Sequence, residues 1–258
     1  MVEQLKEQLL FVGLGMLIYA TIVFLISIVK KRNDIADVAW GMAYCFIILL
    51  LLLNGAVWHP VGVMIYSLVI FWGIRLSLYI FLRNRNKSED FRYKKWREEW
   101  GHTFYWRSYL QVYLLQAIFA LVISAPIILV GSTLTSEIHW LSVVGVAVWV
   151  LGFYFQTVGD QQLRVFKSTN QDKEKVITSG LWKYSRHPNY FGEVTMWWGI
   201  FIVVLPLNFG FWTIISPVVI TYLIRYVSGV PMLEKRYENN RQYQEYKERV
   251  PALFPKFW

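Results

Sequence analysis

Apolar stretches long enough to cross a lipid bilayer recur along the whole chain. An α-helix needs about 18 or more such residues to span roughly 30 Å of hydrocarbon. In lipid, each unpaired backbone N–H or C=O costs several kcal/mol, so these stretches have to be helical. The composition agrees, because 56% of the residues are hydrophobic and only 17% are charged, against about a quarter in soluble domains. The sequence predicts an all-α, polytopic membrane protein.

About seven transmembrane helices are predicted, and no repeat or linker divides the 258 residues, so one integral membrane domain is expected over residues 1–258. A cleavable signal peptide is not expected, because acids stand near the start and the first apolar stretch lacks a small-residue cleavage site. The single cysteine, Cys45, excludes a disulfide scaffold. The predicted spans are residues 9–29, 41–58, 61–82, 110–131, 139–159, 190–207 and 211–229.

The basic residues predict the orientation of these spans. With seven spans, 24 of the 26 lysines and arginines fall on one side of the membrane. Cytoplasmic loops carry the excess of Lys and Arg, so the N-terminus is expected outside, and the C-terminus and the chemistry are expected in the cytoplasm. The short, uncharged outer loops suit a bacterial inner (plasma) membrane. The net charge of +9 then follows from topology and contact with membrane lipids; neither nucleic acid nor an obligate protein partner is expected.

The stretch GLWKYSRHPNYFGE, residues 180–193, is the strongest candidate site. It places Arg186, His187, Asn189, Tyr190 and Glu193 at the start of a predicted span. A His-Pro pair is often only part of a turn. The positive-inside rule alone can explain an arginine on the cytoplasmic side. Polar groups gathered at a membrane entrance nevertheless indicate a bound polar ligand.

A second candidate, GDQQLRVFK, ends the preceding span with Asp160, Arg164 and Lys167. Asp160 and Arg164 are four residues apart on a helix and are expected to pair, although such a surface pair adds only a few tenths of a kcal/mol. The acid could accept from an amide or a sugar hydroxyl, and the two cations could bind phosphate oxygens.

Charged residues near the second and third spans need separate explanations. Asp34 and Asp37 begin the second helix, where one acid can act as a cap. Asp37 is followed by apolar residues and is a candidate for a functional role. Arg75 lies within the third span, where a guanidinium needs a partner or a cavity; Asp37 is the candidate partner. Two carboxylates are too weak a signal for a metal site, and none is expected.

The last span ends near Arg225, and the tail that follows contains an amphipathic run with Tyr246. This run could lie on the bilayer surface. It could also fold over a cytoplasmic pocket, and the two arrangements are compatible.

Together, GDQQLRVFK, GLWKYSRHPNYFGE and SGVPMLEKRY…YQEYKERVPALFP resemble the carboxyl-terminal half of the steroid 5-alpha-reductase family. With NDIADVAWG included, the chain resembles the bacterial branch of that family over nearly its whole length. The Arg-His-Pro-x-Tyr motif is shared with sterol reductases and with isoprenylcysteine-type and phospholipid methyltransferases.

The reductase resemblance implies a seven-helix oxidoreductase of lipid metabolism that acts on CH–CH groups, like a 3-oxo-5-alpha-steroid 4-dehydrogenase. NADPH would pass hydride to the activated C=C (enone) of a steroid-like or other lipid substrate. The carboxyl-terminal half, from about 139 to 258, would carry the cofactor site. Its implied residues are Asp160, Arg164, Lys167, Arg186, His187, Asn189, Tyr190, Glu193, Arg225 and Tyr246.

On the substrate side, the family uses an acid from the second-helix region and a tyrosine from the third helix. Asp37, with Asp34 beside it, matches the acid, and Trp72 stands where the tyrosine is expected. An indole N–H donates a hydrogen bond but is no practical proton donor.

Two other classes of protein remain open. An S-adenosylmethionine-dependent membrane methyltransferase would use the same Arg186–Tyr190 motif and Glu193 to hold its cofactor. A non-catalytic membrane scaffold or lipid carrier would need none of these residues for chemistry. No Gly-x-Gly-x-x-Gly follows a predicted strand, so any nucleotide would be held by helices and loops.

Overall fold

The structure is a computed structural model that describes residues 2–133, 137–170, 172 and 175–257. The described part of the chain is helical and contains no strand, which confirms the predicted all-α class. Lys173, one of the basic residues counted on the predicted cytoplasmic side, lies outside the described residues. The chain divides into two compact units. Unit 1 comprises Met1–Ile138 and Leu207–Thr213, and unit 2 comprises His139–Pro206 and Ile214–Trp258.

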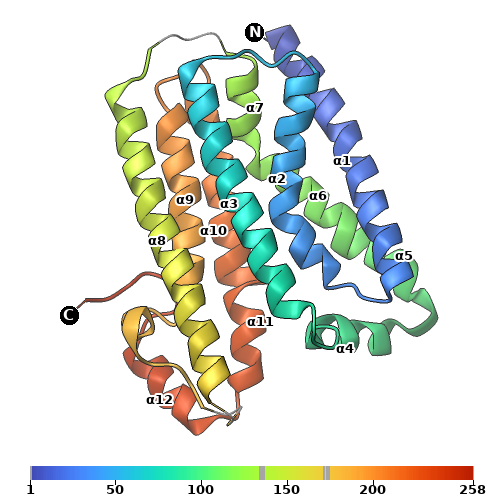
Figure 1. Ribbon diagram of the computed structural model, residues 1–258, viewed down its shortest axis with the longest axis vertical. Helices are drawn as coiled ribbons and strands as arrows, with labels where there is room; N and C mark the ends of the chain where they lie inside the picture. The colour runs from blue at the N-terminus through green and yellow to red at the C-terminus, as the bar shows by residue number, and fades with distance from the viewer. Residues whose placement is uncertain (1, 134–136, 171, 173–174, 258) are drawn as a thin grey trace. The chain divides into compact units, whose positions relative to one another are not determined.

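Unit 1 contains three long helices followed by shorter ones (Figure 1). A π-helical segment, Tyr109–Leu114, joins α5 to α6. The short helix α4 runs across the ends of the long helices instead of alongside them (Figure 1). The helices are α1 Val2–Lys30, α2 Ile35–Leu53, α3 Pro60–Asn84, α4 Phe91–Trp100, α5 Phe104–Ser108, α6 Leu115–Ile123 and α7 Ala125–Gly131.

Unit 2 is built around α8 and α9, which lie side by side (Figure 1). A π-helical segment, Leu223–Val227, continues α10. The helices are α8 Trp140–Thr169, α9 Pro188–Val204, α10 Ile215–Tyr222, α11 Val230–Glu234 and α12 Arg241–Arg249.

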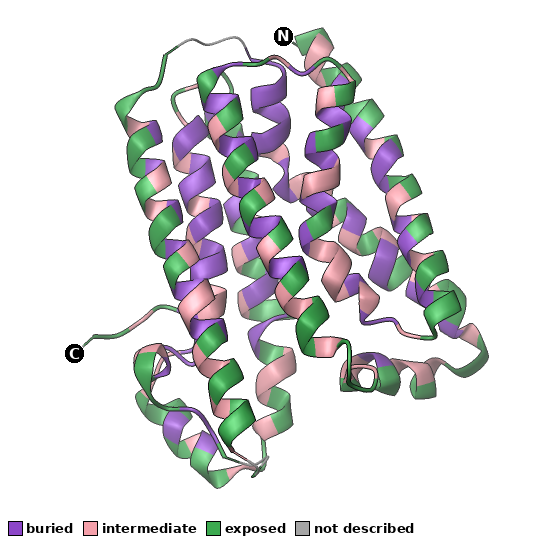
Figure 2. Cartoon of the chain, viewed as in Figure 1, coloured by how far each residue is buried: buried purple, intermediate pink, exposed green. Residues whose placement is uncertain are grey.

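Within the described residues, six helical stretches are long and apolar enough to cross a membrane. Their outward side chains are apolar as well: Leu10, Leu14 and Val29 of α1 are 70%, 64% and 78% exposed, and green marks such residues in Figure 2. The predicted span 190–207, sixth in chain order, corresponds to α9, which has 17 residues and is not among these six stretches. The chain is a multi-pass integral membrane protein. The six stretches are Val2–Lys30, Ile35–Leu53, Pro60–Asn84, Phe91–Ile123, Trp140–Thr169 and Gly210–Tyr237.

Two predicted boundaries differ from the structure. The span expected at 110–131 is interrupted, because α6 ends at Ile123 and Pro126 stands in the first turn of α7. Proline lacks the N–H that would continue the helix, and its ring clashes with the preceding turn. The second helix begins at Ile35, six residues before the expected start, since the hydropathy that marks a span does not detect a polar first turn.

Glycines let α8 and α9 approach at backbone distance. A Cβ atom on Gly152 would lie 2.6 Å from the carbonyl oxygen of Gly192, and one on Gly145 would lie 2.6 Å from that of Gly199. Glycine has no side chain to hold the backbones apart, which is why small residues line such helix contacts in membranes. The close contact places polar residues of α8 directly against the start of α9.

Candidate functional site

At one end of unit 2, the carboxylate of Glu234 contacts three basic side chains that are distant from it or from one another in the sequence. Its Oε1 atom accepts hydrogen bonds from Arg186 Nε at 2.9 Å and Nη2 at 2.8 Å. His187 Nε2 lies 3.3 Å from the same oxygen, and Lys247 Nζ lies 3.5 Å from Oε2. Arg186 and His187 are buried, and the buried cation of Arg186 is tolerated because it is paired and hydrogen-bonded. We call these four residues the Glu234 cluster.

The final segment of the chain is tied to this cluster. The Nη1 atom of Arg186 donates to the carbonyl of Val250, and its backbone N–H donates to the carbonyl of Pro251 at 2.9 Å. Tyr246 donates its hydroxyl to the carbonyl of Trp182. The amphipathic run therefore folds onto unit 2 as α12, with its tyrosines buried.

A groove of about 530 Å³ lies between α11 and α12, beside the Glu234 cluster. This volume falls within the range of small-molecule sites, roughly 300 to 1,000 Å³. Arg225 reaches it from the π-helical segment at the end of α10, a type of irregularity that is frequent at functional sites. α12 forms one wall, as expected for a tail that folds over a pocket. The charged residues that line the groove are Arg225, Glu234, Lys235, Glu238 and Lys247.

Where α8 meets the start of α9, one polar pair is buried and a second is partly buried. Asn189 Nδ2 donates to Asp160 Oδ1 at 3.1 Å, and Gln156 Nε2 donates to Glu193 Oε2 at 3.1 Å. The other atom of each amide, Asn189 Oδ1 and Gln156 Oε1, is buried without a hydrogen-bond donor in the described structure. Buried acceptors are rarely left without a partner. They offer two positions to an N–H or O–H group of a ligand.

The predicted cofactor residues fall into three groups. Arg186 and His187 belong to the Glu234 cluster, and Tyr190 stacks on His187 with ring centroids 5.5 Å apart. Asp160, Asn189 and Glu193 form the pairs between α8 and α9. Arg225 lines the groove, and Tyr246 ties α12 down.

The expected pair between Asp160 and Arg164 is wrong. Asp160 is buried and accepts from Asn189 on the neighbouring helix. Arg164 and Lys167 are exposed further along α8, and Arg164 forms no ion pair with the described residues. The α8–α9 contact turns Asp160 inward, while the last turns of α8 extend beyond it.

Glu234 was missed by the sequence reasoning, as were Gln156 and Lys247. Glu234 lies 47 residues after His187, so no local spacing connects them. The only signal was an acid directly after a proline-led apolar turn, in PMLEKRY.

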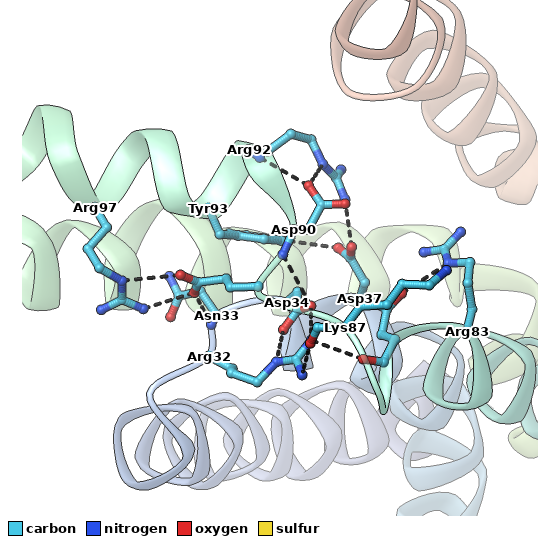
Figure 3. A network of polar contacts seen from close by, with 12 residues as sticks. Arg32, Asn33, Asp34, Asp37, Arg83, Lys87, Asp90, Arg92, Tyr93 and Arg97 are labelled. Atoms are coloured by element: carbon cyan, nitrogen blue, oxygen red, sulfur yellow. Dashed lines mark hydrogen bonds and ion pairs between the residues drawn. The ribbon is translucent and has the colours of Figure 1, made fainter. Parts of the chain in front are cut away.

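In unit 1, Asp34 and Asp37 belong to a network of ion pairs (Figure 3). Asp37 Oδ2 accepts from Arg92 Nη2 at 2.6 Å, and Asp37 Oδ1 accepts from the hydroxyl of Tyr93 at 2.7 Å. Asp34 pairs with Arg32 at 2.7 Å. The network joins the start of α2 to α4, and the substrate-side role of both acids remains a prediction.

Arg75 is not the partner of Asp37, which is bonded to Arg92 and Tyr93. The guanidinium of Arg75 lies over the ring of Tyr79, 5.1 Å from its centroid. Trp72 is buried on α3 and meets Tyr44 edge-on, with ring centroids 5.4 Å apart. Its predicted part in catalysis also remains a prediction.

Among the described residues, no group of three or more His, Cys, Asp or Glu side chains could hold a metal ion.

Burial lowers the pKa of His187 below its ordinary value, and the neighbouring cations Arg186 and Arg225 add to this effect, whereas Glu234 partly offsets it. The unfolded chain then takes up the proton first, so stability is full at neutral pH and falls as pH drops below about 6.5. We expect a loss of at most about 1.4 kcal/mol per pH unit in this window. Unfolding measured between neutral and mildly acidic pH should show it, and His187→Gln should remove it. An unchanged pH profile in the variant would contradict this assignment.

The fold and these contacts define the class of the protein: a polytopic α-helical membrane protein with a polar groove in its carboxyl-terminal unit. Residues 23–250 match a family described as "Protein of unknown function (DUF1295)", and the chain belongs to this family. No curated protein and no solved structure matches the chain.

Proposed function

We propose that the protein is an NADPH-dependent membrane reductase that transfers hydride to the activated C=C of a steroid-like or other lipid substrate. The motifs that resemble the steroid 5-alpha-reductase family support this proposal, and so does the groove of unit 2. The cofactor would occupy that groove and the adjoining polar contact between α8 and α9.

The charge of the groove is the observation that carries the proposal. Three cations line it, and of its two acids Glu234 is already bonded to Arg186 and His187. Arg225, Lys235 and Lys247 thus suit a ligand with phosphate groups, because charge-assisted hydrogen bonds to phosphate are among the strongest in proteins. S-adenosylmethionine carries a sulfonium cation and no phosphate, so the same lining disfavours the methyltransferase alternative.

The buried acceptors of Asn189 and Gln156 also fit a nicotinamide dinucleotide. Its carboxamide and its ribose hydroxyls supply the N–H and O–H donors that these oxygens lack. Their partners, Asp160 and Glu193, hold the two amides in place from the other side.

When bound, NADPH would supply the hydride. The protein would have to position the nicotinamide against the substrate and exclude water from the site. The Glu234 cluster would orient α11 and α12 around the groove. Asp34, Asp37 and Trp72 remain the predicted substrate-side residues. The substrate itself would enter from the lipid phase, in keeping with the apolar surface of the helices.

Ligand binding to the purified full chain tests the proposal. We expect NADPH to bind and S-adenosylmethionine not to bind, as measured by nicotinamide fluorescence and by calorimetry. Arg225→Gln should weaken NADPH binding by roughly tenfold or more, the usual loss for one hydrogen bond to a charged group. Lys183→Gln, at an exposed lysine that does not line the groove, is the matched control. Tight binding of S-adenosylmethionine alone would replace the reductase with a methyltransferase; binding of neither would favour the scaffold or carrier.

A further inference from the structure

At the end of unit 1 where α3 turns into α4, the arginines and the acids neutralise one another. Each of the three pairs is partly buried and closer than 3 Å, and the two nitrogens of a guanidinium suit such fixed contacts with carboxylates. Figure 3 shows that Arg92 of α4 reaches Asp37 at the start of α2, and that the other two pairs lie on either side of this contact, one before α2 and one around α4. The pairs are Arg32–Asp34 at 2.7 Å, Arg92–Asp37 at 2.6 Å and Arg97–Glu89 at 2.8 Å.

A second set of cations in the same segment has no such partner. Arg85, Lys87 and Lys94 are exposed, and none of them forms an ion pair with the described residues. The backbone carbonyl of Lys87 accepts from Arg32 Nη1 at 2.8 Å, so its loop is held while its ammonium group points to solvent. We call these three residues the basic rim.

Aromatic side chains accompany the basic rim. Phe91, Tyr105 and Trp106 are 44%, 55% and 53% exposed, and Trp96 stacks on Trp100 with ring centroids 5.4 Å apart. Exposed aromatic residues at the end of membrane spans lie at the level of the lipid headgroups. The crossing orientation of α4 (Figure 1) is that of a helix in the plane of the membrane surface.

The positive-inside rule accounts for an excess of cations here, but not for their division into two sets. Of the nearby acids, Asp34, Asp37, Glu89, Asp90 and Glu99 have a basic partner in the protein, and Glu98 of α4 forms no ion pair with the described residues. The three cations of the basic rim therefore outnumber the one unpaired acid of α4, and an excess of positive charge remains. Anions from outside the chain balance this excess, and the surrounding membrane supplies phosphate headgroups.

We propose that the basic rim is a docking surface for anionic phospholipid headgroups. Their phosphates bind Arg85, Lys87 and Lys94, and the exposed aromatic residues lie at the boundary between headgroups and acyl chains. Each lysine or arginine near an anionic lipid surface strengthens attachment about fivefold. This surface is independent of the groove in unit 2 and of any activity there.

The test compares the full chain in nanodiscs of phosphatidylcholine alone and of phosphatidylcholine mixed with phosphatidylglycerol. Native mass spectrometry counts retained phosphatidylglycerol, and thermal melting measures its stabilising effect. We expect phosphatidylglycerol to be retained and to raise the melting temperature. A triple variant, Arg85→Gln with Lys87→Gln and Lys94→Gln, should bind it roughly tenfold less tightly or worse. The charge-conserving triple variant, Arg85→Lys with Lys87→Arg and Lys94→Arg, should bind as the natural chain does.

The control removes the same charge from exposed lysines of unit 2, by Lys175→Gln with Lys183→Gln and Lys256→Gln. It should keep phosphatidylglycerol binding. Equal losses in the two triple variants would overturn the proposal, because net charge alone would then explain retention. Equal stabilisation by phosphatidylcholine, or by inorganic phosphate in its place, would overturn it as well.

Discussion

Glu234→Ala should lower the free energy of unfolding by about 3–5 kcal/mol, the usual cost of leaving a buried charge without its partner. The variant removes the carboxylate that Arg186 and His187 share, and Arg186 is only 7% exposed. Unfolding of the purified chain in mixed micelles, or its melting temperature in detergent, measures the loss.

A matched control is Glu245→Ala. Glu245 also pairs with an arginine, Arg241, but their side chains are 53% and 94% exposed, and exposed pairs contribute about 0–1 kcal/mol. Equal losses of unfolding free energy in the two variants would show that the Glu234 cluster stabilises the protein no more than an exposed ion pair does. The double variant Arg186→Met with Glu234→Ala should recover part of the loss, because no uncompensated cation remains.

Gly192→Ala should force α8 and α9 apart. In most helix interiors this change stabilises a protein by about 0.5–1 kcal/mol. Here the added methyl carbon would lie 2.3 Å from the backbone nitrogen of Gln156 and 2.4 Å from the carbonyl oxygen of Gly152. Backbone atoms cannot rotate away, so we expect a loss of at least about 1–3 kcal/mol, the range for overpacked cores.

Gly13→Ala provides the control, because a Cβ atom there would meet nothing within 4 Å. It should be neutral or slightly stabilising. Gly192→Ala should also weaken ligand binding at the site, since separation of the helices parts Gln156 from Glu193 and Asn189 from Asp160. Normal stability of this variant would contradict the close contact of the two helices.

The helical class and the approximate spans were predictable because hydropathy is a local property of the sequence. A stretch such as Trp140–Thr169 has to be a helix in lipid, whatever it packs against. The interruption at Pro126 was in principle visible too, as proline ends helices for local reasons. The prediction of one span over 110–131 missed this interruption because the apolar stretch continues without a break on both sides of Pro126.

The candidate site was only partly predictable. Asn189 and Glu193 were identified by their position at the entrance of a span, and they do lie among buried polar groups. Their partners could not be chosen from the sequence. Asp37 bonds to Arg92, 55 residues away, and Arg186 bonds to Glu234, 48 residues away.

The sequence by itself determined that this is a multi-pass helical membrane protein and placed most of the candidate site residues in its carboxyl-terminal half. The reason is that lipid imposes length, apolarity and helical hydrogen bonding on each span separately. Only the tertiary structure decided which charges neutralise one another and which remain available, as Arg225 and Lys235 do along the groove. That choice depends on which distant side chains come within about 3 Å after the helices pack, and glycines such as Gly152 and Gly192 control that packing.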